Sequence, residues 1–273
     1  MNGESSSSSS NGKHQGADLR RTESLSISPE LFEKLYLSPD NKVAGDLRST
    51  FGNPTPLSII YSSSAVVGFT IALCPLSIEF MGWRGAGGQT ATVGANWFFG
   101  GLLLIISGIL EFFLGNTFPS VVFMSYGAHF MTFAATFQPF YNAVGAFVVD
   151  GAPTPQFDES FAFYALFMGV LSTIFLVCSL RTNVVFVVVF IGASLGFFLA
   201  AGSFWTTAQG MTIGATLLVG AGGAFFVAAM SGWYLLAAIM FATLDLPWGL
   251  GSIPVGDLST LIKGASQKRK VKE

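Results

Sequence analysis

The sequence predicts an all-α membrane protein with six transmembrane helices, and two observations carry that prediction. Hydrophobic residues make up 51% of the 273 residues and charged residues only 10%, whereas soluble domains carry about 25% charged residues. The apolar residues also gather into successive stretches, each near the ~20 residues that a spanning helix needs. The net charge of −2 is too small to suggest a nucleic-acid partner.

The chain divides into a long apolar region and two polar tails. Residues 1–50 are rich in serine and have few apolar side chains to offset the entropy lost on ordering, so we expect a disordered cytoplasmic tail. Residues 51–258 form the expected transmembrane domain, and residues 259–273 form a basic cytoplasmic tail.

The apolar region opens with a proline motif, Asn53-Pro54-Thr55-Pro56-Leu57. The two prolines lack amide donors and have a fixed φ, which suits the first turn of a helix. Asn53 can accept a hydrogen bond from an unpaired amide of that turn. The motif therefore predicts a rigid helix start with a polar side chain at its mouth, and the alternative interpretation is a helix cap after a linker.

The six spans are expected at about 57–80, 93–114, 119–139, 161–180, 184–203 and 211–241. Basic residues flank the outer ends of this region at Arg48 and Lys263, and Arg181 separates the fourth and fifth spans. The connection between the third and fourth spans carries Asp150 and Asp158 instead. Because basic flanks stay on the cytoplasmic side, both termini are expected in the cytoplasm.

Glycines four residues apart suggest close helix contacts. Gly192 and Gly196 form one such pair, and Gly210 and Gly214 form another. In lipid this spacing lets backbones approach closely, either between helices or between subunits. The alternative interpretation is that glycine is simply common in membrane helices.

Polar residues inside the spans are few, and each must offset the cost of leaving water. Tyr126 and His129 lie three residues apart in the third span, hence on one helical face. Ser62 follows the proline motif, and Glu111 ends the second span. We find no zinc-ligand cluster, nucleotide-binding glycine loop or nucleophile–histidine–acid set in the sequence, so we expect neither an enzyme nor a bound cofactor or metal.

Four motifs together resemble a known family. They are Asn53-Pro54-Thr55-Pro56-Leu57, Phe98-Phe99-Gly100-Gly101, Gly115-Asn116-Thr117-Phe118 and Ser125-Tyr126-Gly127. In order and spacing they resemble the acetate uptake transporter family (the GPR1/FUN34/YaaH type), which contains fungal acetate/ammonia-export proteins and the bacterial succinate–acetate permease. The resemblance extends over about residues 51–258.

The resemblance implies a homohexameric ring of six-helix protomers in the lipid of the plasma membrane. Each protomer would carry acetate or a related small monocarboxylate by proton symport or as an anion channel. The carboxylate site would comprise Asn53, Pro54, Thr55, Pro56, Leu57, Ser62, Tyr126 and His129, with Tyr126 at a narrow waist. Structural roles would fall to Gly100, Gly101, Glu111, Asn116 and Thr117.

Ser62 and His129 depart from the family pattern, since relatives carry aromatic residues there, which suggests a roomier or more polar waist. His129 has two interpretations, a proton-coupling residue or a packing residue whose ring hydrogen-bonds a neighbour. For the protein as a whole, the alternatives to monocarboxylate transport are an ammonium or small neutral-solute pore and a membrane sensor or scaffold without transport.

Overall fold

The structure is a computed structural model that describes residues 57–244 and 253–258. The described residues all belong to one compact unit. Both predicted tails, 1–50 and 259–273, lie outside the described residues. So do four members of the proline motif, Asn53, Pro54, Thr55 and Pro56. Leu57 begins the first described helix, and its side chain is likewise outside the description.

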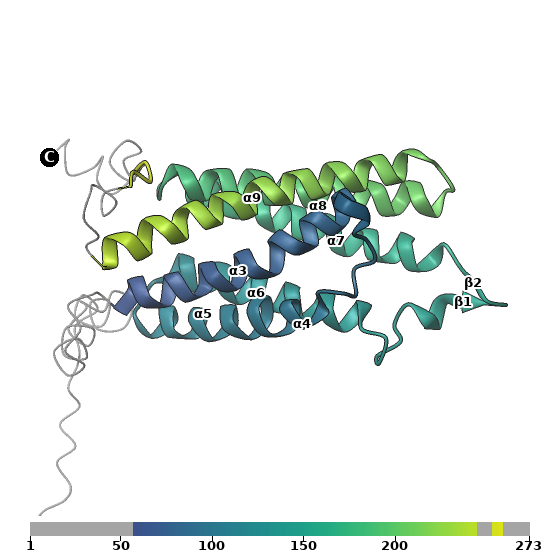
Figure 1. The fold of residues 1–273 in the computed structure, drawn as a ribbon, viewed down its shortest axis with the longest axis horizontal. Coiled ribbons are helices and arrows are strands. Elements are labelled where there is room, and N and C mark those ends of the chain that lie inside the picture. Colours follow the sequence, from purple (N-terminus) through teal and green to yellow (C-terminus); the bar gives the residue numbers. More distant parts are fainter. Residues whose placement is uncertain (1–56, 245–252, 259–273) are drawn as a thin grey trace, which may run out of the picture. The chain divides into compact units, whose positions relative to one another are not determined.

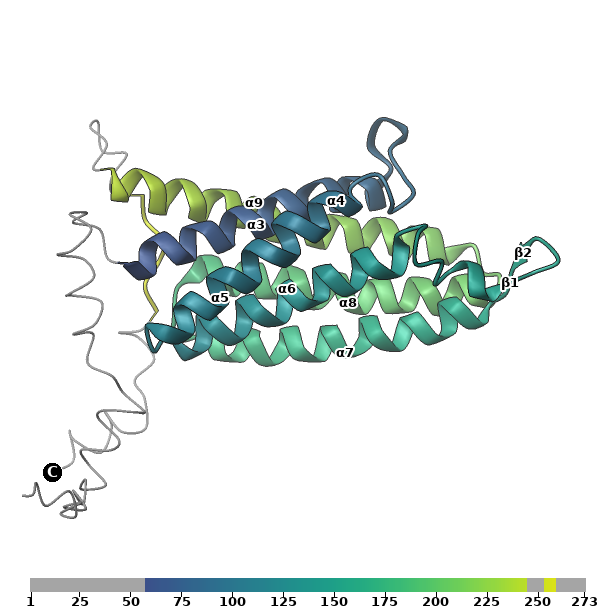
Figure 2. The same ribbon diagram turned by 90° about the horizontal axis from the view of Figure 1, so that it is seen from below.

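Six helical rods make up the described unit. They are α3 (Leu57–Met81), the second rod formed by α4 (Val93–Ala95), η3 (Asn96–Leu103) and α5 (Leu104–Phe113), then α6 (Thr117–Phe137), α7 (Gln156–Ser179), α8 (Val184–Ala208) and α9 (Ile213–Thr243). The rods run side by side along one direction and alternate in sense, so that α3 starts and α9 ends at the same end of the bundle (Figures 1 and 2).

Short elements join the rods. The turn η2 (Trp83–Gly85) follows α3, and η4 (Gly145–Phe147) leads into a hairpin of β1 (Val148–Val149) and β2 (Ala152–Pro153). The hairpin turns at Asp150 and Gly151, both with positive φ, as a tight two-residue turn requires. We call this end of the bundle the hairpin end and the opposite end the α3-start end.

The predicted all-α membrane class is confirmed. Within the described residues, 5 helical segments are long and apolar enough to cross a membrane. The remaining rod, α6, has 21 residues and no charged side chain, but hydroxyl groups such as Ser120, Ser125 and Thr132 lower its hydropathy.

Two predicted boundaries differ from the structure. Helix α7 begins at Gln156, five residues earlier than expected, so Asp158 and Glu159 lie in its first turn and not in a loop. Acidic side chains in a first turn interact favourably with the helix dipole. Helix α8 continues to Ala208 and ends before Gly210, whose φ of 70° suits a helix terminus.

The two predicted glycine pairs differ in where they lie in the structure. A Cβ atom on Gly196 would lie 2.4 Å from the Phe225 ring, and one on Gly192 would lie 2.7 Å from the Ala224 carbonyl oxygen. This face of α8 therefore packs against α9 within the protomer. The interpretation of Gly210 and Gly214 as a helical face is wrong, because Gly210 lies in the turn between α8 and α9.

The second rod packs equally closely. Its middle section, η3, is a π-helix. A Cβ atom on Gly100 would lie 2.8 Å from Ala72 Cβ on α3 and 2.5 Å from the Phe130 ring on α6, and one on Gly101 would meet Met131 of α6 at 2.5 Å. Only glycine lets these three rods come so near one another.

Candidate functional site: an axial series of cavities

Three cavities follow one another along the bundle. The inner cavity, nearest the α3-start end, has a volume of about 30 Å³. The aromatic cavity comes next, with about 40 Å³, and the vestibule at the hairpin end has about 530 Å³. Phe69 and Tyr126 line both the inner and the aromatic cavity, and Phe204 lines both the aromatic cavity and the vestibule.

Along each helix, successive residues line successive cavities. On α6, Val122 and Phe123 line the inner cavity, Phe130 and Phe133 the aromatic cavity, and Thr136 the vestibule. Helices α8 and α9 show the same progression in their own directions. The three cavities therefore form one axial series through the protomer.

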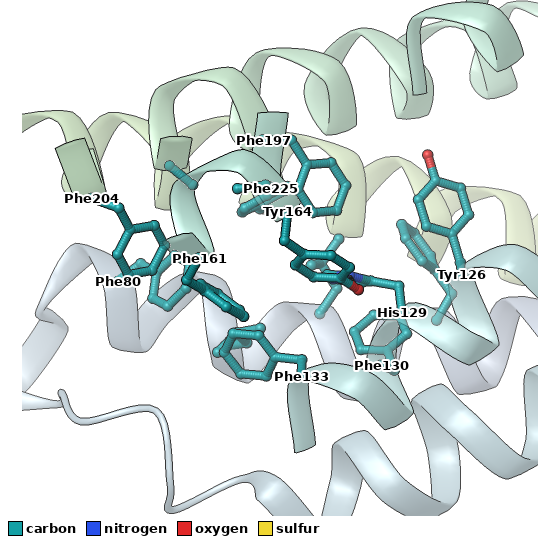
Figure 3. A pocket seen from close by; sticks show the side chains of 15 residues that line it. Phe80, Tyr126, His129, Phe130, Phe133, Phe161, Tyr164, Phe197, Phe204 and Phe225 are labelled. Atoms are coloured by element: carbon teal, nitrogen blue, oxygen red, sulfur yellow. Dashed lines mark hydrogen bonds between the residues drawn. The ribbon is translucent and has the colours of Figure 1, made fainter. Parts of the chain in front are cut away.

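Aromatic rings dominate the middle of the series. Rings from α3, α6, α7, α8 and α9 surround the aromatic cavity (Figure 3). They belong to Phe69, Phe80, Tyr126, His129, Phe130, Phe133, Phe161, Tyr164, Phe197, Phe204 and Phe225. Because one water needs roughly 10–15 Å³ of such space, a solute larger than a few waters passes only if these rings move.

Tyr126 separates the inner cavity from the aromatic cavity. Its side chain is 6% exposed and its ring stacks on Phe190 at 6.3 Å between centroids. Its hydroxyl lies 2.8 Å from Ser172 Oγ, and Ser172 donates its own proton to the Met168 carbonyl at 2.7 Å. Tyr126 is therefore the donor to Ser172, and the ring is held from two sides.

His129 lies one turn further along α6, in the aromatic cavity. Its Nδ1 lies 2.8 Å from the Tyr164 hydroxyl, and the two rings stack at 5.7 Å between centroids. Phe197 approaches the imidazole edge-on at 4.9 Å. No Asp, Glu, Lys or Arg is among the described residues that line this cavity.

The vestibule is the polar part of the series. Gln89, Gln138, Asn142 and Thr207 line it together with the ends of α7 and α8. Asp158 is the one charged side chain in the lining that the described residues provide. A carboxylate in this position lowers the local concentration of anions and raises that of cations.

A buried carboxylate cluster lies near the α3-start end. Glu111 is 0% exposed, and its Oε1 accepts a 2.7 Å hydrogen bond from Ser62 Oγ. Its Oε2 accepts a 2.6 Å hydrogen bond from Asn116 Nδ2. The cluster thus joins α3, the end of α5 and the turn that leads to Thr117, the first residue of α6.

Comparison with known proteins identifies the family. A sequence model described as the GPR1/FUN34/yaaH family matches residues 37–250. The chain belongs to this family. The resemblance carried by the four motifs is thereby confirmed.

Several relatives of this GPR1/FUN34/yaaH family member are known. Protein alcS of Aspergillus fumigatus is 45% identical over 244 residues, which cover 86% of this chain and 86% of that protein. The acetate transporter protein patA of Aspergillus clavatus is 28% identical over 211 residues, covering 77% of this chain and 80% of patA.

A solved structure shares the fold. The structure of the bacterial acetate channel SatP matches with a TM-score of 0.57 at 24% identity, covering 72% of this chain and 98% of the SatP chain. At that identity the likeness supports the fold alone.

The structure brings only some of the expected site residues together. Tyr126 and His129 both line the aromatic cavity, whereas Ser62 is bound to Glu111 and lines none of the three cavities. Tyr164 and Ser172 were not anticipated from the sequence, because they lie in an apolar stretch of α7 and pair with α6 only in the folded protein. Glu79 was also missed, although a charge between Ile78 and Phe80 marks it in the sequence.

Proposed function

We propose that this family member transports acetate or a related small monocarboxylate along the axial series of cavities. The observation that carries the proposal is that Tyr126, like Phe69, lines both the inner and the aromatic cavity, which supports a narrow waist on a path through the bundle. The names of two similar proteins, the acetate transporter protein patA and the bacterial acetate channel SatP, support the choice of substrate.

The apolar lining of the path favours a small acid that becomes protonated or loses its hydration shell at the waist. Aromatic and aliphatic groups dominate the middle of the path, and such a constriction gates by dewetting. At the α3-start end, the unpaired amides and dipole of a helix start favour a carboxylate. We propose that Asn53, Pro54, Thr55, Pro56 and Leu57 hold the anion at this end of the path and that it passes Tyr126 together with a proton.

The proposal includes assembly into a ring of six protomers in the plasma membrane, with both termini in the cytoplasm. Large apolar side chains on the outside of the second rod support contact with lipid or with neighbouring protomers. Phe98 is 67% exposed, Phe112 66% and Phe113 72%. Arg181, an exposed basic residue between α7 and α8, fits a cytoplasmic location for the α3-start end.

An ammonium or neutral-solute pore is the second candidate. Asp158 in the vestibule favours it, because a lone carboxylate attracts cations and repels acetate. The aromatic cavity fits a neutral solute equally well.

Uptake into liposomes tests the proposal. Purified protein would be reconstituted and labelled acetate uptake measured with and without an inward pH gradient, beside protein-free liposomes, because acetic acid also crosses lipid unaided. We expect uptake above the protein-free rate, and loss of that excess in Tyr126→Trp, which fills the waist. Uptake equal to protein-free liposomes, or uptake of ammonium alone, would reject monocarboxylate transport.

A further inference from the structure

Five described side chains outside the axial cavities carry buried polar atoms without a hydrogen-bond partner, and three of them, Glu79, Thr92 and Asn96, lie near the hairpin end of α3 and the second rod. Glu79 and Thr92 are half-buried. Both Oδ1 and Nδ2 of Asn96 lack a hydrogen-bond partner among the described residues, and so do Thr92 Oγ1 and Glu79 Oε2. The Asn96 side chain is 0% exposed. A buried amide without a partner is costly, so the unpaired Asn96 amide beside the half-buried oxygens of Thr92 and Glu79 points to a ligand.

Helix register brings the three side chains together. Gly100 on η3 contacts Ala72 on α3, and the two rods are antiparallel. Two helical turns from that contact toward the hairpin end, the second rod passes Asn96 and reaches Thr92. Over the same distance α3 runs from Ala72 to Glu79. The backbone N–H of Asn96 donates to the backbone carbonyl of Thr92 at 3.1 Å, so these two residues lie one helical turn apart on the same face.

Contacts agree with this register. The Thr92 hydroxyl lies within hydrogen-bonding reach of the Glu79 carboxyl. The elements packed on α3 at this level, η3 and α9, contain no Asp, Glu, His, Lys or Arg, and neither does α4, which follows Thr92. Arg84, on the η2 turn, is exposed, and no salt bridge joins it to Glu79 in the described part of the chain. No basic side chain among the described residues therefore pairs with the Glu79 carboxyl.

We propose that Glu79, Thr92 and Asn96 form a binding site for a small monovalent cation, either a hydronium ion or Na⁺. A carboxylate, a hydroxyl and an amide oxygen supply the hard oxygen ligands that such an ion takes, and Asn96 Nδ2 donates to an accompanying water. The site lies beside the vestibule end of the path, where a bound cation offsets the charge of an arriving carboxylate. Only this coupling step rests on the proposed transport function; cation binding does not.

Thermal stability tests the binding step directly. A ligand that binds only the folded state raises the melting temperature. The purified protein would be melted in detergent in NaCl or in N-methylglucamine chloride of equal ionic strength, and across a pH series without Na⁺. We expect stabilisation by Na⁺ or by acid in the wild type and its loss in Glu79→Gln, whereas Glu159→Gln, a carboxylate outside the site, behaves as the wild type. If Glu79→Gln does not fold, Thr92→Val takes its place.

An unchanged response to both Na⁺ and pH in the variant that folds would overturn the site. The two arms also separate the sources, because stabilisation in Na⁺ at constant pH indicates sodium and stabilisation by acid alone indicates a proton.

Flux measurements test the coupling. Acetate uptake into liposomes would be driven by an inward Na⁺ gradient at constant pH or by a pH gradient without Na⁺, beside acetate exchange in the absence of either. We expect one gradient to stimulate wild-type uptake and Glu79→Gln to lose that stimulation. Exchange without stimulation by either gradient would reject coupling and leave transport standing. Absence of exchange would instead reject the proposed function, and the melting experiment would still decide the site.

Discussion

The hydroxyl of Tyr126 on α6 donates a hydrogen bond to Oγ of Ser172 on α7, with 2.8 Å between the two oxygens. Ser172 in turn donates to the Met168 carbonyl. This relay fixes the Tyr126 ring at the boundary between the inner and aromatic cavities, where Phe175 meets it edge-on at 5.9 Å. The hydroxyl proton is committed to Ser172, so the ring acts on a passing solute mainly through its size.

Removing the Tyr126 ring should widen the range of transported acids. In Tyr126→Ala the inner and aromatic cavities merge, so we expect longer carboxylates such as butyrate to compete with acetate more strongly than in the wild type. Tyr126→Phe is the matched control, because it keeps the ring and loses one hydrogen bond, worth about 0.5–1.5 kcal/mol of stability. Competition assays across a series of acids measure the effect, and equal selectivity in all three proteins would show that the waist lies elsewhere.

Replacing His129 with phenylalanine should leave the pH profile of uptake intact. The imidazole lies among the rings of Tyr164, Phe197 and Phe130, and its Nδ1 is hydrogen-bonded to the Tyr164 hydroxyl. A phenylalanine fits the same aromatic surroundings, so packing is retained and one hydrogen bond is lost. Acetate uptake against external pH measures this, and a flattened acid stimulation in His129→Phe would establish the proton-coupling interpretation.

Sequence patterns predicted the fold well because burial in lipid leaves a strong signal. Long apolar stretches have few interpretations other than spanning helices, so the class and the approximate spans followed directly. The ends of α7 and α8 were less accurate. Hydropathy alone assigns Asp158 and Glu159 to a loop, although a helix tolerates acidic residues in its first turn.

The site was less predictable, because pairing between helices has no local signature. The spacing of Tyr126 and His129 showed that they share a face of α6, but Ser172 and Tyr164 are 46 and 35 residues away from them. The same holds for Glu79 and Thr92, which come together only because α3 and the second rod are antiparallel.

A leucine at Gly196 should prevent folding and not merely dissociate an oligomer. The added side chain would overlap the Phe225 ring, which packs inside the same protomer. Gly223→Leu is the matched control, since no atom lies within 4 Å of a Cβ built there. Overpacking typically costs about 1–3 kcal/mol. Detergent size-exclusion profiles and yields compare the two, and a smaller but folded and active Gly196→Leu particle would place a subunit contact on this face.

The proline motif should govern affinity for the carboxylate. If Asn53 and the amides at the helix start hold the anion, Asn53→Ala weakens acetate uptake mainly through a higher KM, while insertion in the membrane persists. Asn41→Ala, a change outside the motif, serves as the comparison. Wild-type kinetics in a well-expressed Asn53→Ala protein would favour the alternative interpretation, in which the motif is only a helix cap.

Loss of the Glu111 carboxylate should destabilise the α3-start end more than loss of either donor. Glu111→Ala leaves the hydroxyl of Ser62 and the amide of Asn116 without their acceptor, and each hydrogen bond contributes about 0.5–1.5 kcal/mol. Ser62→Ala removes only one of the two bonds and leaves the Asn116 bond in place. We therefore expect the melting temperature to fall in the order wild type, Ser62→Ala, Glu111→Ala.

Acetate uptake in Ser62→Ala separates packing from binding, because Ser62 contacts Glu111 and lines none of the described cavities. A large change in its KM with little change in melting temperature would instead place Ser62 in the substrate path, as the sequence suggests.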